Sequence, residues 1–467
     1  MVVLAPSLGG TLLAILTCDL PEPSRMPTPS PATSLIEHLV ERIETSRATA
    51  AVIGIGYVGL PLALELARAG VRTLTVDIDP RKVDAVNRGE SYIPDVDSAQ
   101  LAEAVTAKKL LASTDFDLLA EADTINIYVP TPLRKTKDPD LSYVVSAVEQ
   151  VKTRLRRGQL VILESTTYPG TTVEVVQPML EESGLKAGDD FFLAFSPERV
   201  DPGNGRWHTG NIPKVVGGID EASTRAASAL YRHIVQTIVP VSSTRVAEMV
   251  KLLENTFRAV NIGMVNELAM MCRDLDVDVW EVIEAAATKP FGFMPFFPGP
   301  GLGGHCIPID PFYLSWKARQ FGFESRFIEL AGHINSNMPR FVVDRVVEAL
   351  NSQAKAVKGS HVHLFGMAYK ADVNDARESP ALDLAQLLMR RGALVTYSDP
   401  HVTSVAEHGV TLTAVPADAA LDRGFDCAVI ATNHKAFDYD AIYRRAPLIV
   451  DTRNAFKGRS SPHVFRL

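Results

Sequence analysis

The sequence predicts an α/β protein in which two Rossmann-like doubly wound parallel-sheet domains are joined by a long central helix and a helical middle domain. Three observations lead to this prediction. Short apolar runs alternate with helical stretches from Ala50 to about residue 235, the alternation stops at Thr244 for about 30 residues of helical periodicity, and it resumes at His361. A chain of 467 residues is long enough for about three domains.

Composition argues against several classes of protein. Hydrophobic residues make up 46% and charged residues 22% of the chain, as in a globular protein and unlike a disordered chain or a coiled coil. The net charge of −8 and the lack of a Lys/Arg cluster argue against a nucleic-acid binder. The four cysteines are widely spaced and form no CxxC pair. We therefore expect neither a disulfide framework nor a metal site, and a cytoplasmic protein.

Residues 1–33 are predicted to be a disordered N-terminal extension, because a Pro/Ser-rich segment follows a short apolar run. No basic residue precedes that run and Gly9-Gly10 interrupts it, so a signal peptide is disfavoured and Met26 is an alternative start. Deletion of residues 1–25 should then leave activity unchanged. The apolar spacing from Ser34 to Ala48 predicts a short amphipathic helix.

The N-terminal domain, 34–235, is predicted to bind NAD. An apolar run ends in Gly54-Ile55-Gly56-Tyr57-Val58-Gly59, and a helical stretch follows. Such a turn lets backbone N–H groups approach a pyrophosphate, although a glycine turn without cofactor is the alternative. Asp77 ends the next strand, where a carboxylate binds ribose hydroxyls and disfavours NADP. Further strands of this sheet are expected at 124–129, 160–166, 191–196 and 214–218.

A central helical domain is expected over 236–345 and a second Rossmann-like domain over 346–467. Strand-like runs HVHLFGMAY, LVTYSD, FDCAVIAT and APLIVDT carry the second domain. Ser379-Pro380 reads as a cap and first turn, and Gly392 ends the helix that it opens.

Cys306 is the strongest candidate for covalent chemistry. An isolated cysteine is usually a small buried hydrophobe, which we expect for Cys272 and Cys427. Cys306 instead follows a glycine-rich loop, 298–304, at a loop-to-helix junction. The field of the helix N-terminus would lower its pKa there and favour the thiolate.

Two neighbours of this thiol could handle protons. Asp310, four residues on, would lie on the same side of a helical turn and act as a base or orient a water, unless it only caps the helix ahead of Pro311. His305 is the weaker candidate, because the side chains of adjacent residues point apart.

The long central helix carries a polar stripe. Lys251, Asn255 and Arg258 are spaced i, i+4, i+7 and are surrounded by apolar residues. Lys251 and Asn255 are suited to stabilise an oxyanion, whereas a solvated helix face is the alternative. Three further segments, YVPTP (128–132), ESTT (164–167) and SPER (196–199), follow strands. We expect them to converge at one crevice, because ligands bind outside the carboxyl ends of parallel strands.

Seven collinear motifs resemble the UDP-glucose/GDP-mannose dehydrogenase family over about residues 48–460. They are GIGYVGLPLA, YVPTP, LESTTYPGTT, SPERVDPGN, KLLENTFRAVNIGMVNELA, PGPGLGGHCIPIDPFYL and FGMAYKADVNDARESPA. The phrases TKPFGFMPFFPGPGLGGHCIPIDPFYL and VPVSSTRVAEMVKLLEN look most like bacterial members that oxidise UDP-N-acetylglucosamine for surface polysaccharides.

The resemblance implies NAD-dependent oxidation of C6 of a UDP-sugar from alcohol to carboxylic acid, with two NAD used in succession. Cys306 matches the nucleophile, which would form a thiohemiacetal that is oxidised to a thioester and then hydrolysed. The C-terminal domain would bind the UDP-sugar, and the central helix would mediate a homodimer or higher homo-oligomer.

The resemblance also implies roles for single residues. Lys251 and Asn255 would stabilise oxyanions, and Asp310 would assist proton transfer and hydrolysis. Catalytic residues are thus expected at Cys306, Lys251, Asn255, Asp310, Thr131 and Glu198, the last two positioning water and substrate. Cofactor-binding residues are expected at Gly54, Gly56, Tyr57, Val58, Gly59, Asp77, Thr131, Thr166 and Arg377. Substrate-binding residues are expected at Glu198, Arg199, Lys251, Asn255, Arg258, Gly301, Gly303, Gly304, Lys370 and Arg453.

Two positions depart from the animal UDP-glucose enzymes, which have a lysine at Ile309 and a glutamate at Pro202. The sugar therefore stays open: UDP-N-acetylglucosamine is favoured, with UDP-glucose and UDP-N-acetylmannosamine as alternatives. An inactive protein that binds NAD and a nucleotide sugar is the non-enzyme alternative.

Overall fold

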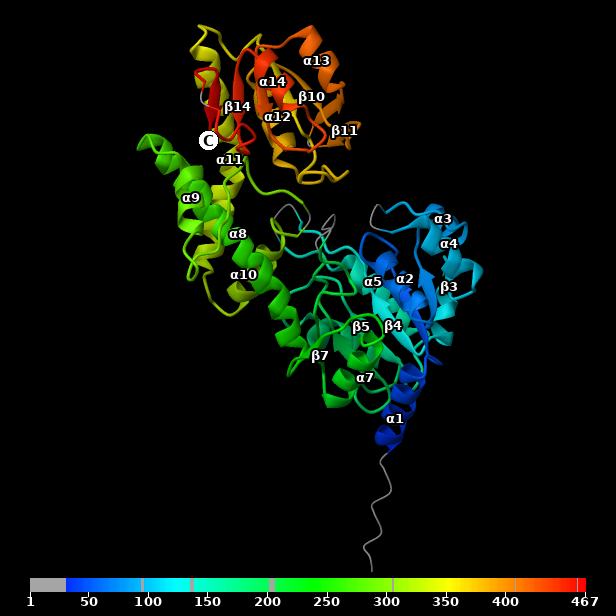
Figure 1. The fold of residues 1–467 in the computed structure, drawn as a ribbon. Helices are drawn as coiled ribbons and strands as arrows, with labels where there is room; N and C mark the ends of the chain where they lie inside the picture. Colours follow the sequence, from blue (N-terminus) through cyan, green and yellow to red (C-terminus); the bar gives the residue numbers. More distant parts are fainter. Residues whose placement is uncertain are drawn as a thin grey trace, which may run out of the picture.

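The computed structural model describes residues 31–93, 96–134, 138–200, 206–304, 306–407, 409–459 and 461–467. It shows two α/β lobes connected by long helices (Figure 1). The expected extension up to residue 30, with its alternative start at Met26, lies outside the described residues, as do Pro202 and His305. None of the helices described is long and apolar enough to cross a membrane.

The N-terminal lobe is built on an eight-stranded sheet of order β3-β2-β1-β4-β5-β6-β7-β8. Its strands are β1 Thr49–Ile53, β2 Arg72–Val76, β3 Leu110–Ser113, β4 Thr124–Ile127, β5 Leu160–Leu163, β6 Phe192–Phe195, β7 Lys214–Gly218 and β8 Ile238–Pro240. Strands β1 to β6 are parallel, whereas β7 runs antiparallel to β6. The sheet is thus mixed at one edge rather than wholly parallel. The edge strands β3 and β8 were not expected, since they are short and partly exposed and lack a continuous apolar run.

Helices cover both faces of this sheet (Figure 1). They are α1 Pro31–Glu44, α2 Gly59–Arg68, α3 Pro80–Asn87, α4 Ser98–Thr106, the 3₁₀ helix Phe116–Glu121, α5 Ser142–Lys152, the π-helical turn Thr172–Val176, α6 Gln177–Glu181 and α7 Glu221–Tyr231. The amphipathic helix α1 begins three residues before the expected start, with Pro31 suited to a first helical turn. Its apolar side chains enter the core beside α7, namely Ile36, Leu39, Val40 and Ile43.

The middle of the chain is helical, as expected. It consists of α8 Thr244–Asp274, α9 Val279–Ala287, α10 Asp310–Gln320 and α11 Arg326–Asn351. Ser243 caps the 31-residue α8 by accepting a hydrogen bond from Val246 N–H. The later part of α11 packs into the core of the C-terminal lobe, for example through Val342 and Leu350. A single helix therefore crosses the expected boundary between residues 345 and 346.

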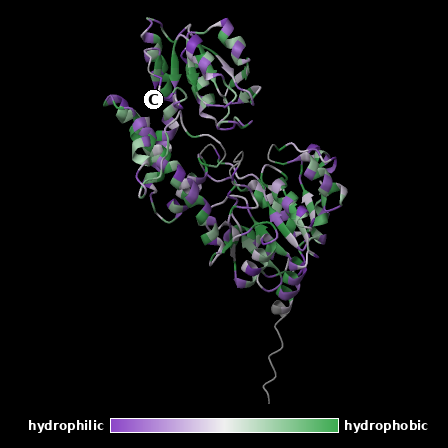
Figure 2. Ribbon diagram, in the orientation of Figure 1, coloured by the Kyte–Doolittle hydropathy of each residue, from purple (hydrophilic) through white to green (hydrophobic). Residues whose placement is uncertain are grey.

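The C-terminal lobe has a parallel sheet of order β10-β9-β13-β14-β15. Its elements are β9 His361–Phe365, α12 Pro380–Arg390, β10 Leu394–Ser398, the hairpin β11 Ser404–Glu407 and β12 Val410–Thr413, α13 Ala417–Arg423, β13 Cys427–Ile430, α14 Tyr439–Arg445, β14 Ile449–Asp451 and β15 Val464–Arg466. The hairpin and β15 were not expected. Figure 2 shows the apolar residues concentrated on the strands of both lobes.

The first turn of the C-terminal lobe repeats that of the N-terminal lobe. Gly54 after β1 has φ +89°, and Gly366 after β9 has φ +90°. Their N–H groups donate to Val76 O and Ser398 O, each at 2.8 Å. This correspondence bears out the prediction of two Rossmann-like units.

Candidate active site

The glycine turn after β1 has the shape of a dinucleotide cradle. A Cβ on Gly54 would lie 2.0 Å from Tyr128 O, and one on Gly59 would lie 1.9 Å from Gly54 O, so both positions require glycine for packing. A Cβ on Gly56 would instead have no atom of the described residues within 4 Å. The residue before α2 is Val58, whose apolar side chain cannot cap the helix. The space beside Gly56 at the N-terminus of α2 is thus open to a pyrophosphate.

Asp77 is fixed beside this turn. Its Oδ2 accepts a hydrogen bond from Ile55 N–H at 3.0 Å, and its Oδ1 accepts one from Asp79 N–H at 2.9 Å. Lys82 Nζ, which the sequence analysis did not consider, lies 3.5 Å from Asp77 Oδ2. The carboxylate therefore stands rigidly at the end of β2, where the ribose of a dinucleotide is expected.

Cys306 is exposed, whereas Cys272 and Cys427 are buried, which confirms the expected contrast among them. Residues 306–309 form a turn, and α10 begins at Asp310. Asp310 N–H donates to Cys306 O at 2.8 Å, so one helical turn separates the two residues and places them on the same side.

The expectation of a lowered thiol pKa was wrong. Loss of water around the thiol, followed by the negative charge of Asp310, raises the pKa of Cys306 to about 11. Lys251, Arg377 and Arg258 act in the opposite direction. Burial outweighs the helix field, because Cys306 lies four residues before α10 starts, where that field is weak. The charge of Asp310 acts in the same direction as burial. The thiol therefore starts protonated.

Asp310 is not a helix cap. Ile309 precedes α10, and the buried Asp310 carboxylate accepts a hydrogen bond from Asn255 Nδ2 at 2.5 Å through Oδ2. Burial raises the pKa of Asp310 to about 6, although Lys251 and Asn255 act to lower it. An acid with such a pKa is well placed to exchange protons near neutral pH.

The polar stripe of α8 is not a solvated face. Lys251 and Asn255 are only 8% and 6% exposed, and both interact with Asp310. Arg258 is exposed, but its charge still acts on Cys306. Two adjacent elements, α8 and the start of α10, thus bring together the thiol, a carboxyl, an ammonium and an amide.

The glycine loop 299–304 packs against the C-terminal lobe. A Cβ on Gly299 would lie 2.7 Å from Arg453 Nη1, and Gly304 has φ +84°, with Tyr369 Cε2 2.7 Å from its Cβ position. Gly303 and Gly301 lie against Pro380 in the same way. The glycines let the loop backbone meet the second lobe closely. Burial also lowers the pKa of Arg453 to about 10.

Arg377 links the two lobes. It lies in the loop before α12, and its guanidinium carbon lies 5.6 Å from the ring centroid of Tyr57 in the N-terminal glycine turn. Its carbonyl accepts a hydrogen bond from Gly304 N–H at 3.3 Å. An arginine expected near the cofactor therefore does reach the dinucleotide turn.

A cavity of about 620 Å³ opens beside these residues, which is a suitable size for a small ligand. The N-terminal lobe, the helical middle and the C-terminal lobe all contribute to its wall. Representative lining residues are Pro132, Val260, Gly301, Ile307, Arg377 and Pro380.

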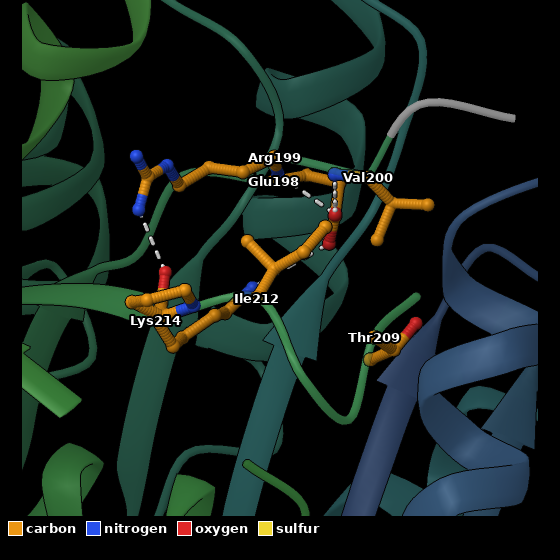
Figure 3. Close-up of a pocket in the computed structure, with 7 residues that line it drawn as sticks. Glu198, Arg199, Val200, Thr209, Ile212 and Lys214 are labelled. Carbon is orange, nitrogen blue, oxygen red and sulfur yellow. Dashed lines mark hydrogen bonds and ion pairs between the residues drawn. The ribbon is translucent and has the colours of Figure 1, made fainter. Parts of the chain in front are cut away.

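Other expected site residues have different surroundings. Glu198 and Arg199 line a second, much smaller cavity together with Lys214 (Figure 3). Thr131 contributes its carbonyl, which accepts a hydrogen bond from Tyr313 OH at 2.7 Å. Thr166 follows β5 and Lys370 follows Tyr369, both half-buried.

Sequence reasoning missed two buried groups at this edge. Lys214 opens β7 and contacts Glu164 and Glu198, and a lysine at the head of an apolar strand was the available signal. Glu248 on α8 accepts hydrogen bonds from Gly170 N–H at 2.6 Å and from Thr172 N–H at 2.9 Å. Burial raises the pKa of Glu248 to about 7. It ties the loop after β5 to the helix that carries Lys251.

The described residues also bring Asp372, His401 and His434 together, with candidate ligand atoms within 4.8 Å of one another. His434 Nδ1 accepts the N–H of Asp372 at 2.9 Å, and its Nε2 bonds Asp399 Oδ2 at 3.0 Å. Lys435 Nζ lies 3.3 Å from Asp372 Oδ2. Because these bonds already satisfy the buried imidazole, we assign the group a structural role in its loop.

Comparison with known proteins adds independent findings. Residues 48–235 match the NAD binding domain of the UDP-glucose/GDP-mannose dehydrogenase family, residues 245–337 match its central domain and residues 363–458 match its UDP binding domain.

Individual relatives differ in the sugar that their names give. A UDP-N-acetyl-D-glucosamine 6-dehydrogenase of Pseudomonas aeruginosa is 36% identical over 83% of this chain and 90% of its own. An NDP-N-acetyl-D-galactosaminuronic acid dehydrogenase of Ralstonia nicotianae is 35% identical over 89% of this chain and 98% of its own. A solved structure of a UDP-D-ManNAc dehydrogenase of Pyrococcus horikoshii superimposes with a TM-score of 0.82 at 35% identity, over 90% of this chain and 98% of its own.

Proposed function

Because this chain belongs to the UDP-glucose/GDP-mannose dehydrogenase family, and is thus an NAD-dependent oxidoreductase of UDP-sugars, we propose that it oxidises C6 of UDP-N-acetylglucosamine to the uronic acid. The reaction uses two NAD in succession and Cys306 as the covalent nucleophile. We place it in the cytoplasm, in the biosynthesis of a surface polysaccharide.

One observation carries this proposal: the Cys306 thiol lies among the buried Asp310 carboxyl, the Lys251 ammonium and the Asn255 amide. The next residues, Ile307 and Pro308, line the cavity between the lobes. This set matches the needs of alcohol oxidation that passes through an aldehyde. NAD held at the glycine turn would supply the acceptor for the hydride that leaves C6 in each oxidation. The glycine turn with Asp77 fits the adenosine and pyrophosphate of that cofactor.

The chain's own residues handle the other atoms. In the first oxidation, Asp310 accepts the proton of the C6 hydroxyl and then releases it to water. It next accepts the proton that leaves the thiol, and the sulfur of Cys306 bonds to the aldehyde carbon to give a thiohemiacetal. Lys251 and Asn255 donate to the oxyanion; the amide of Asn255 has two hydrogens, so one can stay on Asp310. Loss of hydride from this adduct leaves a thioester. Water, oriented by Asp310, then breaks the C–S bond and releases the acid and the thiol.

UDP-N-acetylmannosamine is the second candidate substrate. The similarity to the Pyrococcus horikoshii structure named for that sugar favours it, whereas the Pseudomonas aeruginosa relative favours the glucosamine. Stereochemistry at one carbon is read by a few pocket contacts, each worth about 1–3 kcal/mol.

We also propose a homodimer through α8. An apolar strip on this helix is exposed, and three of its members, Phe257, Met264 and Met271, are spaced seven residues apart as in a helix–helix seam. The double variant Phe257→Glu, Met264→Glu should convert the dimer to a monomer in light scattering. Exposed Met389→Glu on α12 is the control, and an unchanged mass of the double variant contradicts the α8 seam.

The function is tested by NADH release with UDP-N-acetylglucosamine, UDP-N-acetylmannosamine, UDP-N-acetylgalactosamine and UDP-glucose. We expect the highest kcat/KM with the first and two NADH for each sugar consumed.

The variant Cys306→Ser should form no acid while NAD binding, followed by calorimetry, stays as in the wild type. Full turnover by this variant would refute the covalent route.

A further inference from the structure

Lys214 is a buried cation between two carboxylates. It is the first residue of β7 and is only 6% exposed. Its Nζ lies 2.5 Å from Glu164 Oε2 and 3.5 Å from Glu198 Oε2. Burial lowers the pKa of Lys214, but the two carboxylates outweigh it and raise that pKa above its usual value. The side chain therefore stays an ammonium at working pH.

Glu164 is the fixed end of this chain of charges. It is 1% exposed, and its other oxygen, Oε1, accepts hydrogen bonds from Asn126 Nδ2 at 2.7 Å and from Tyr231 OH at 2.5 Å. Three donors from β4, α7 and β7 thus hold a single carboxylate in place. Lys214 in turn cannot move without breaking its bond to that anchor.

Glu198 is the end of this row of charges that lies at the cavity. Its Oε1 accepts hydrogen bonds from Arg199 N–H at 2.7 Å and Val200 N–H at 2.5 Å, which leaves Oε2 toward Lys214. Figure 3 shows Glu198 and Lys214 on the wall of the small cavity after β6. The next residue, Arg199, pairs with Glu254 at 2.6 Å, one position before Asn255 on α8.

Stability does not explain a buried ammonium with two carboxylates. Removing such charged groups from water commonly costs as much free energy as their mutual attraction supplies. An apolar side chain would fill the same space without that cost. The arrangement does, however, determine where the Glu198 carboxylate stands.

We propose that Lys214, anchored by Glu164, is a positioning residue that holds the Glu198 carboxylate for the sugar. The role rests on the proposed function, because Glu198 acts only if a UDP-sugar binds. Its substitution should act through Glu198 alone, and it should leave the dinucleotide turn undisturbed.

A double-mutant cycle tests this coupling. Lys214→Met should lower kcat/KM for the UDP-sugar about tenfold or more, with NAD affinity unchanged, and Lys214→Arg should restore part of the loss. In a protein that already carries Glu198→Gln, adding Lys214→Met should not lower kcat/KM any further.

Lys152→Met is the matched control, because Lys152 also lies between two carboxylates, Glu149 at 2.6 Å and Glu182 at 2.8 Å, but on the surface. It should leave kcat/KM unchanged. Equal losses from Lys214→Met with and without Glu198, or no loss at all, would overturn the proposal.

A crystal structure of Lys214→Met provides a readout that does not need turnover. We expect the Glu198 carboxylate to leave its wild-type position, and an unmoved carboxylate contradicts the positioning role. If the wild type releases no NADH with any UDP-sugar, the proposed function fails. The crystal structure of Lys214→Met still tests whether Lys214 holds the Glu198 carboxylate in place.

Discussion

The reactivity of Cys306 depends on the ionisation of its neighbour. Burial, and after it the charge of Asp310, raises the pKa of the thiol, and burial raises the pKa of Asp310 to about 6. The two groups share a site in which one proton is more favourable than none. An aldehyde that arrives with Asp310 ionised therefore meets a thiol and a base side by side.

Removing the charge of Asp310 should make the thiol more acidic. In Asp310→Asn, we expect faster alkylation of Cys306 by iodoacetamide at pH 8 than in the wild type, because the negative charge that raises the thiol pKa is gone. Cys272 and Cys427 are buried and should react slowly in both proteins. Asp274→Asn, at an exposed position at the end of α8, is the control. Slower or unchanged alkylation would contradict the coupling.

The same carboxyl sets a pH dependence for turnover. Below pH about 6 Asp310 is protonated and cannot accept a proton, so kcat should fall as the pH drops through 6 and level off above it. The residual activity of Asp310→Asn should not show this fall in kcat at low pH. A wild-type profile that stays flat from pH 5 to 8 would exclude this role of Asp310.

At the scale of elements, the β1–α2–β2 unit places Asp77 where it selects the cofactor. We expect the wild type to favour NAD over NADP by at least about tenfold in kcat/KM, since the carboxylate repels a 2′-phosphate. Asp77→Ser should reduce the preference for NAD, because it removes the carboxylate that repels the 2′-phosphate. The ammonium of Lys82, which lies 3.5 Å from Asp77 Oδ2 in the wild type, can then attract that phosphate. Asp84→Ser, exposed on α3, should not change it. Equal wild-type values for the two cofactors would refute the assignment.

The glycine loop is a second element whose conformation is tied to its packing. Gly304→Ala places a methyl group 2.7 Å from Tyr369 Cε2 at φ +84°. Gly322→Ala is the control. It has the same kind of backbone strain, at φ +75°, but no atom of the described residues lies within 4 Å of its new Cβ. Both should lose about 1–2 kcal/mol of stability from backbone strain. Only Gly304→Ala should also lose kcat/KM for the UDP-sugar, as thermal melts and steady-state kinetics will show.

At the scale of the whole molecule, the lobes are joined by shared parts rather than by a linker. The helix α11 serves the middle region at its start and the C-terminal core at its end, and the loop 299–304 lies against Arg453 and Tyr369. The cavity lies among these parts and has no complete wall in either lobe alone. Each lobe therefore needs the other for the site.

Truncation separates the N-terminal extension from the fold. Deletion of residues 1–25 should leave the melting temperature and activity unchanged, because α1 is retained. Deletion of residues 1–44 removes four buried apolar side chains, each worth about 1.5–3 kcal/mol, together with the Arg42–Asp123 ion pair at 2.7 Å. It should lower the melting temperature strongly. A shorter deletion as damaging as the longer one would overturn this division.

What the sequence determined by itself is local or repetitive: the strand–helix alternation, the glycine turn after β1, the carboxylate at the end of β2 and the unbroken α8. Each depends on neighbours within a few residues, so a one-dimensional pattern carries it. Tertiary structure alone decided the protonated state of Cys306, the antiparallel β7 and the burial of Lys214 between two glutamates. Those properties depend on charges and solvent supplied by residues that are distant along the chain, and no spacing rule contains them.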